Sequence, residues 1–105
     1  MKIAIYPGSF DPITLGHLDI IRRAALCFDK VFVCVMDNCD KKSHMFPAEK
    51  RLEMLRRSVE ELPNVEAELY RGLLADYARE KGGHVIVKGL RNATDFDLEY
   101  QMAAI

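Results

Sequence analysis

The strongest constraint on the fold is an alternation of short apolar runs with stretches long enough to form helices. Runs rich in β-branched residues at positions 2–6, 30–36, 65–70 and 84–88 predict strands, and the second is almost continuously apolar. Such strands, separated by helices, are typical of a parallel sheet covered on both faces. Because crossovers between parallel strands are right-handed, the pattern predicts a doubly wound α/β sheet.

The segments between these runs have helical periodicity. Apolar residues recur every three or four positions over residues 18–28 and again over 52–62. A shorter helix is expected over residues 73–81, and a last one from about residue 92 to the end of the chain. This last helix has no stop signal and is apolar, so we expect a single domain over residues 1–105 that is cut at its C-terminal side.

Composition excludes several classes of function. The 105 residues include 15 Lys and Arg and 16 Asp and Glu, for a formal net charge of −1. A protein that binds nucleic acid through its backbone phosphates needs a basic excess on at least one face. The longest apolar run covers only residues 31–36, against about 20 residues for a spanning helix. The N-terminus breaks at Pro7 before a signal-peptide core could form. We therefore expect a cytoplasmic protein without a nucleic-acid or membrane partner.

The cysteines and histidines do not form a recognisable metal site. Three cysteines and three histidines are scattered along the chain without zinc-site or disulfide-framework spacing. Cys27 and Cys34 are expected as small buried residues. We expect no metal held by protein side chains.

The loop between the first strand and the first helix carries the most distinctive residues. Ligands of open α/β sheets bind beyond the carboxyl ends of the strands. Residues 6–17 lie there and read Y-P-G-S-F-D-P-I-T-L-G-H, which predicts a shaped loop with free backbone N–H groups. His17 falls in the first turn of the helix, where the helix dipole favours an anion. We expect its imidazole to donate to a phosphate oxygen; the alternative is a loop with a capping histidine.

Two further segments place cations at the same edge of the sheet. Residues 37–42 follow the second strand and carry two lysines, which on their own would usually form a solvated loop. After the fourth strand, Gly89 permits close approach of the backbone, and Lys88 and Arg91 add positive charge. The sequence contains no Walker lysine motif and no G-x-G-x-x-G fingerprint. Since all three segments stabilise negative charge, we expect a phosphate-rich ligand.

With these residues in view, the sequence resembles a known family. Residues 6–17 are similar to the T/H-x-G-H signature region of the nucleotidyltransferase superfamily, in the form found in bacterial phosphopantetheine adenylyltransferases. Residues 41–51 resemble that family's lysine loop and the helix after it, and residues 88–102 resemble its R-G-L-R-x-x-x-D-F-E-x-E-x-Q-M segment. The resemblance covers the chain in order and implies a Rossmann-like nucleotidyltransferase domain over residues 1–105.

The resemblance implies a reaction. An adenylyl group would pass from ATP to 4′-phosphopantetheine, giving dephospho-coenzyme A and pyrophosphate in coenzyme A biosynthesis. The attacking phosphate is already anionic, so positioning and charge stabilisation suffice without a general base. The family also implies Mg²⁺ bound with ATP and a homo-oligomer, usually a hexamer. Two alternatives remain open: a related nucleotidyltransferase with another phosphate acceptor, and a truncated chain that binds nucleotide or phosphopantetheine without turnover.

The resemblance also implies roles for individual residues. The catalytic residues would be His17 and Lys41, which would stabilise the charge that develops on the α-phosphate. The residues implied to bind ATP are Ser9, Phe10, His17, Gly89, Leu90, Arg91 and Glu99. Those implied to bind the acceptor are Ser9, Lys41, Leu74 and Lys88.

The chain departs from the family pattern at a few positions. Lys88 stands where the family has arginine, so it keeps the charge but loses the two-pronged grip on phosphate, and weaker acceptor binding is expected. Pro47 stands where a serine or threonine usually caps the following helix. The family continues past residue 105 through another strand and a serine-rich loop that holds ATP phosphates.

Overall fold

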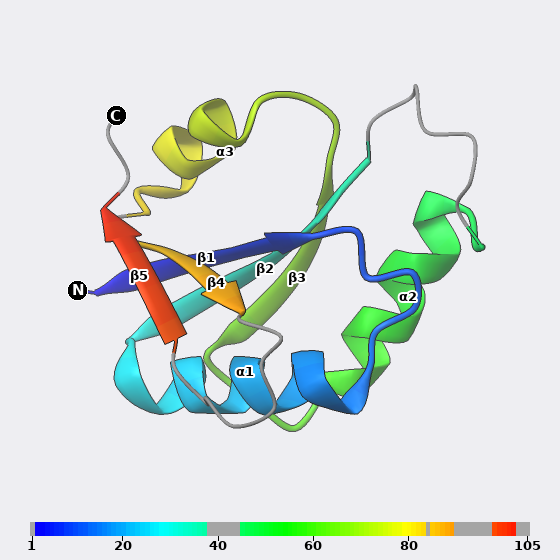
Figure 1. Ribbon diagram of the computed structural model, residues 1–105, viewed down its shortest axis with the longest axis horizontal. Helices are drawn as coiled ribbons and strands as arrows, with labels where there is room; N and C mark the ends of the chain where they lie inside the picture. Colours follow the sequence, from blue (N-terminus) through cyan, green and yellow to red (C-terminus); the bar gives the residue numbers. More distant parts are fainter. Residues whose placement is uncertain (1, 38–44, 84, 90–97, 103–105) are drawn as a thin grey trace.

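The computed structural model describes residues 2–37, 45–83, 85–89 and 98–102 (Figure 1). Helices follow each of the first three strands in the described part of the chain. The elements, in chain order, are β1 (Ile3–Gly8), α1 (Leu15–Cys27), β2 (Lys30–Met36), α2 (Ala48–Ser58), β3 (Val65–Tyr70), α3 (Leu74–Lys81), β4 (Val85–Gly89) and β5 (Leu98–Met102).

The strands form one sheet in the order β3-β2-β1-β4-β5. The pairs β1–β2, β2–β3 and β1–β4 are all parallel. The chain moves outward from β1 through β2 to β3 and then crosses back to place β4 on the other side of β1. This reversal makes the carboxyl end of β1 the topological switch point, where ligands of doubly wound sheets bind. The predicted α/β class and the parallel core of the sheet are confirmed.

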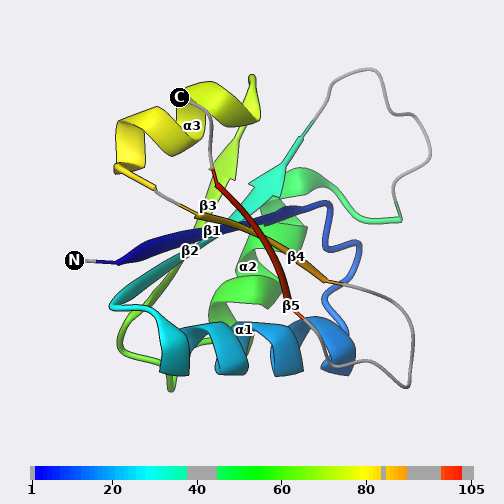
Figure 2. The same ribbon diagram turned by 60° about the vertical axis from the view of Figure 1, so that its left-hand side comes forward.

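Helices cover both faces of the sheet. Figures 1 and 2 show α1 and α2 on one side and α3 on the other. Because side chains of a strand alternate between faces, Ala4 and Tyr6 pack with the α1 and α2 side chains, whereas Ile5 packs with Tyr77 of α3. Gly82, with φ of 68°, ends α3 in the left-handed conformation that glycine adopts without strain.

The prediction of a helix from residue 92 to the chain end is wrong for Leu98–Met102. These residues form β5, which pairs antiparallel with β4. Their sequence alternates apolar and polar residues, a period that suits a strand, while the four-residue spacing of Leu98 and Met102 also suits a helix. Pairing with β4 satisfies backbone groups that would otherwise be left open at the sheet edge. The rest of the expected helix lies outside the described residues.

Two smaller expectations concern the burial of the cysteines and membrane-spanning helices. Cys34 is buried in β2 as predicted, but Cys27 is exposed at the end of α1, so its predicted burial is wrong. No helix in the described ranges combines the length and hydrophobicity needed to cross a lipid bilayer.

Candidate functional site

His17 is held at the start of α1 by two reciprocal hydrogen bonds. Thr14 precedes the helix, and its hydroxyl accepts a hydrogen bond from the His17 backbone N–H at 3.2 Å. The Thr14 backbone N–H in turn donates to His17 Nδ1 at 3.0 Å. This is a capping box with histidine in the place that glutamate or glutamine usually takes. Because Nδ1 accepts, the proton of the neutral ring lies on Nε2, the nitrogen from which His17 can donate.

The structure therefore contains the capping histidine that the sequence left as an alternative. Capping and anion binding are compatible here, because capping uses Nδ1 and leaves the ring proton on Nε2. Histidines that bind a metal through one ring nitrogen are commonly oriented in the same way, by a hydrogen bond at the other nitrogen. The capping box thus sets the tautomer of the ring and holds it at Nδ1.

Phe10 packs between β1 and His17. Its ring is 2% exposed and makes edge-to-face contacts with Tyr6 and His17, with ring centroids 5.3 Å and 5.1 Å apart. Its φ of 47° is unusual for a residue other than glycine, so the packing of the ring must offset backbone strain. A Cβ at Gly8 would lie 3.1 Å from the Phe10 ring, which explains the glycine there.

Asp11 joins the loop after β1 to the entrance of α2. Its carboxylate accepts hydrogen bonds from the backbone N–H groups of Met45, at 2.6 Å, and Phe46, at 2.9 Å. Pro47 precedes α2 and forms no side-chain cap. The chain entering α2 is thus held by a carboxylate from a distant loop in place of a capping side chain of its own.

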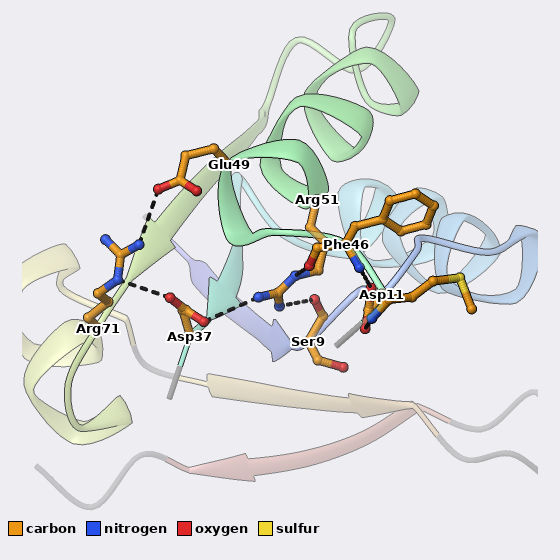
Figure 3. Close-up of polar contacts among 8 residues, drawn as sticks. Ser9, Asp11, Asp37, Phe46, Glu49, Arg51 and Arg71 are labelled. Atoms are coloured by element: carbon orange, nitrogen blue, oxygen red, sulfur yellow. Dashed lines mark hydrogen bonds and ion pairs between the residues drawn. The ribbon is translucent and has the colours of Figure 1, made fainter. Parts of the chain in front are cut away.

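Arg51 connects three segments at the carboxyl edge of the sheet (Figure 3). Its guanidinium donates to the Ser9 carbonyl at 2.9 Å and, through Nε, to the Phe46 carbonyl at 3.0 Å. The third hydrogen bond is an ion pair with the Asp37 carboxylate, at 3.2 Å. The Arg51 side chain is 1% exposed, so this buried charge is paired with a carboxylate, and each of its three nitrogens donates a hydrogen bond.

The ion pairs continue outward from Asp37. Arg71, directly after β3, donates to the second oxygen of Asp37 at 2.9 Å and to Glu49 of α2 at 3.2 Å. A hydrogen bond from its own backbone, followed by the bond from Arg71, lowers the pKa of the Glu49 carboxyl. The hydrogen bonds with Glu49 and Asp37 raise the pKa of Arg71. The charges at the ends of β2 and β3 thus neutralise one another.

The predicted site residues lie on several different elements. Ser9, Phe10 and His17 lie together after β1, whereas Leu74 opens α3 and packs against the cluster on the opposite face of the sheet. Lys88 and Gly89 end β4, the parallel neighbour of β1, so they reach the same edge as Ser9. The backbone of Glu99 lies opposite Lys88 in β5, in a strand and not in the predicted helix. Lys41, Leu90 and Arg91 lie outside the described residues.

The sequence pattern indicates no role for Asp11, Asp37 or Arg51. A signal for Arg51 exists in the helix pattern: Ala48, Arg51 and Leu55 are spaced by three and four residues and are all buried. A charged residue in register with the apolar face of a helix must find partners in the interior. The partners themselves are too distant in sequence to be read from the pattern.

Comparison with known proteins identifies a family that this chain matches and several similar proteins. The model of the family described as cytidylyltransferase-like matches residues 5–105. The chain is 54% identical over 103 residues to a phosphopantetheine adenylyltransferase from Clostridium novyi (strain NT), and 53% identical over 103 residues to one from Desulforudis audaxviator (strain MP104C). Each alignment covers 98% of this chain and 63% of the relative, so the chain spans less than two thirds of the length of these proteins.

Two solved structures share the fold. The NadR protein in complex with NAD and AMP-PNP aligns with a TM-score of 0.60 and 28% identity over 67% of this chain and 20% of that chain. A lipopolysaccharide core biosynthesis protein from Thermoplasma volcanium GSS1 aligns with a TM-score of 0.68 and 22% identity, covering 90% of this chain and 80% of that one. At such low identity, the second likeness concerns the fold alone.

Proposed function

Since this chain belongs to the cytidylyltransferase-like family, we propose that the protein containing it transfers an adenylyl group from ATP to 4′-phosphopantetheine. The products are dephospho-coenzyme A and pyrophosphate, as in coenzyme A biosynthesis. The observation that carries the proposal is the His17 ring, which the capping box orients with its proton on Nε2 at the carboxyl end of β1. The identity of 54% to a phosphopantetheine adenylyltransferase supports this choice of acceptor.

In the proposed reaction, an oxygen of the acceptor phosphate attacks the α-phosphorus of ATP. The bond from that phosphorus to the bridging oxygen breaks, and pyrophosphate leaves. The acceptor is an anion already, so no side chain needs to remove a proton. His17 Nε2–H donates to an α-phosphate oxygen, where charge increases in the transition state. We propose Lys41 as a second donor to the same phosphate, and Arg91 as a contact to the rest of the triphosphate.

The remaining site residues line the two substrates. Ser9, Phe10, Gly89, Leu90 and Glu99 contact the nucleotide in this proposal, and Ser9, Lys41, Leu74 and Lys88 contact the acceptor. Support comes from the sheet, because β1 and β4 are parallel neighbours and their carboxyl ends meet at one edge. Leu74 lies across the sheet from His17, at the start of α3, where an extended pantetheine arm would have an apolar contact.

ATP enters this reaction as its Mg²⁺ complex. Magnesium prefers oxygen ligands and usually keeps several water molecules beside substrate phosphates. Within the described residues, no group of three or more Asp, Glu, His or Cys side chains is arranged to hold a metal ion. We propose that the substrate phosphates, together with water, would hold Mg²⁺, which would offset the negative charge of the triphosphate.

We further propose that residues 1–105 form one domain of a cytoplasmic homo-oligomer, with six copies as the family resemblance implies. Support for one domain is the shared sheet, since both apolar clusters include residues of β1 and β2. The oligomer proposal draws on exposed apolar side chains such as Leu26, at 89% exposure, which a neighbouring copy could cover. Sedimentation analysis of the full-length protein tests the number of copies.

The central experiment measures pyrophosphate release by the full-length protein that contains this chain. With MgATP, we expect release only when 4′-phosphopantetheine is present, and dephospho-coenzyme A as the second product. Turnover with nicotinamide mononucleotide or a sugar phosphate in place of 4′-phosphopantetheine would assign another acceptor. Binding of both substrates, measured by calorimetry, without any turnover would favour a non-catalytic role.

A further inference from the structure

The buried guanidinium of Arg51 lies at the start of a chain of contacts that ends at His17. The Arg51 side chain is 1% exposed. Its guanidinium donates to the Ser9 carbonyl after β1, to the Asp37 carboxylate after β2 and to the Phe46 carbonyl before α2. One of those acceptors, the Ser9 carbonyl, belongs to the turn on which the proposed nucleotide contacts lie.

The turn that follows Ser9 is conformationally demanding. Phe10, the next residue, has a φ of 47°, and its ring is buried between Tyr6 and His17. The bond from Arg51 fixes the orientation of the peptide group that joins Ser9 to Phe10, because the Ser9 carbonyl belongs to that group. The Phe10 ring then contacts the His17 imidazole at a centroid distance of 5.1 Å. The path from Arg51 to His17 thus consists of one hydrogen bond, one peptide group and one ring contact.

We propose that Arg51 is a positioning residue: through the Ser9 carbonyl and the Phe10 ring, its buried guanidinium orients the His17 imidazole toward the reacting phosphate. This inference rests on the proposed adenylyl transfer for its effect on rate. It goes beyond the family resemblance, which implies no role for Arg51. The same guanidinium also holds Asp37 and Phe46, so the turn is oriented relative to the ends of two neighbouring segments.

If the buried ion pair of Arg51 only stabilised the fold, its removal would have a different effect. Removing Arg51 would then lower the stability of the fold and leave His17 unchanged in the molecules that remain folded. The two roles are separated by a measurement on His17 itself. In a long-range ¹H–¹⁵N spectrum, the chemical shifts of the imidazole nitrogens and of the ring protons report the surroundings of the ring, including its contact with the Phe10 ring.

The variants R51K and R51M test the proposal in the full-length protein. Lysine keeps the charge, but a single ammonium cannot bond Ser9, Phe46 and Asp37 in the geometry of the guanidinium. Methionine fills much of the space without a charge, and Asp37 keeps its ion pair with Arg71. We expect kcat to fall at least tenfold in both, with KM for ATP changing less than threefold, and the imidazole signals of His17 to shift as its contact with the Phe10 ring is lost.

Two control variants match these changes. R57K alters an exposed arginine of the same helix, whose guanidinium forms an ion pair with Glu53. L55A destabilises the same helix through a buried apolar side chain, so its lower unfolding temperature sets the scale for loss of stability alone. Both controls are expected to keep the His17 imidazole signals of the unmodified protein.

The outcomes separate this inference from the proposed function. If the unmodified protein transfers no adenylyl group, the proposed function fails, and the His17 spectra of R51K and R51M still decide the inference. A folded R51K or R51M with kcat within threefold of the unmodified protein and an unchanged His17 spectrum would overturn it. Failure of both variants to fold would place Arg51 in the fold itself and overturn the positioning role as well.

Discussion

The backbone N–H of Thr14 donates to Nδ1 of His17 at 3.0 Å, while the Thr14 hydroxyl accepts from the backbone N–H of His17 at 3.2 Å. One pair of residues thus both begins α1 and selects the tautomer of the histidine. A capping box ordinarily satisfies two backbone donors and nothing more. With histidine in the third helical position, the same bonds leave a defined N–H donor on a ring at the end of the central strand.

The first prediction concerns H17A. Loss of a preorganised donor to a phosphate oxygen in the transition state costs a factor of about 10² to 10³ in rate. We therefore expect kcat for adenylyl transfer to fall by that factor, with KM for ATP much less affected. Steady-state kinetics of the full-length protein give both quantities, and R57A, at an exposed position of α2, is the control. An equal rise in KM with an unchanged kcat would contradict the assigned role.

The second prediction concerns D11N. Asp11 accepts two backbone N–H groups, from Met45 and Phe46, and an amide oxygen can replace only one of the two carboxylate oxygens. We expect the free energy of unfolding to fall by about 1.5 to 3 kcal/mol, the range for hydrogen bonds to a charged group. Urea denaturation measures it. D29N is the matched control, because Asp29 accepts one such bond, from exposed Lys2.

The third prediction concerns the pH dependence of stability through Glu68. Burial alone would raise the pKa of this carboxyl, but hydrogen bonds from Lys81 and Tyr77 outweigh burial and lower it. A carboxyl whose pKa is lower in the folded state stabilises the fold above its unfolded pKa of about 4.3, and that contribution disappears as the pH falls through the folded value.

The variant E68Q tests this sign. Between about pH 5 and pH 3, we expect the unmodified protein to lose more unfolding free energy than E68Q does. Urea denaturation at a series of pH values measures both curves. E53Q, at an exposed glutamate of α2, is the control and should follow the unmodified protein. Parallel curves for E68Q and the unmodified protein would refute the assignment.

The fourth prediction concerns the two described cysteines. Burial, followed by the charge of Glu68, raises the pKa of the Cys34 thiol to about 12, whereas Cys27 is exposed. The thiolate is the form that reacts with alkylating reagents. At pH 8, iodoacetamide should modify Cys27 and leave Cys34 intact until denaturant is added, as peptide mass spectrometry would show. Equal labelling of both in the folded protein would contradict the burial of Cys34.

The parallel core of the sheet could be predicted because its signals are local. The apolar run over β2 and the helical spacing over α1 are properties of adjacent residues, and their alternation restricts the topology. The strand β5 could not be predicted in this way. The spacing of Leu98 and Met102 fits either a strand or a helix, and pairing with β4 decided between them.

The sequence by itself determined the α/β class, the place of the candidate site beyond the strand ends, and the presence of His17 at a helix start. These follow from periodicity and from the order of the elements. Only the tertiary structure decided what Arg51 does. The bond from Arg51 to Ser9 joins residues 42 positions apart, and its acceptor is a backbone carbonyl, a group that every residue possesses. No residue pattern identifies such a partner, because folding alone brings the two groups together.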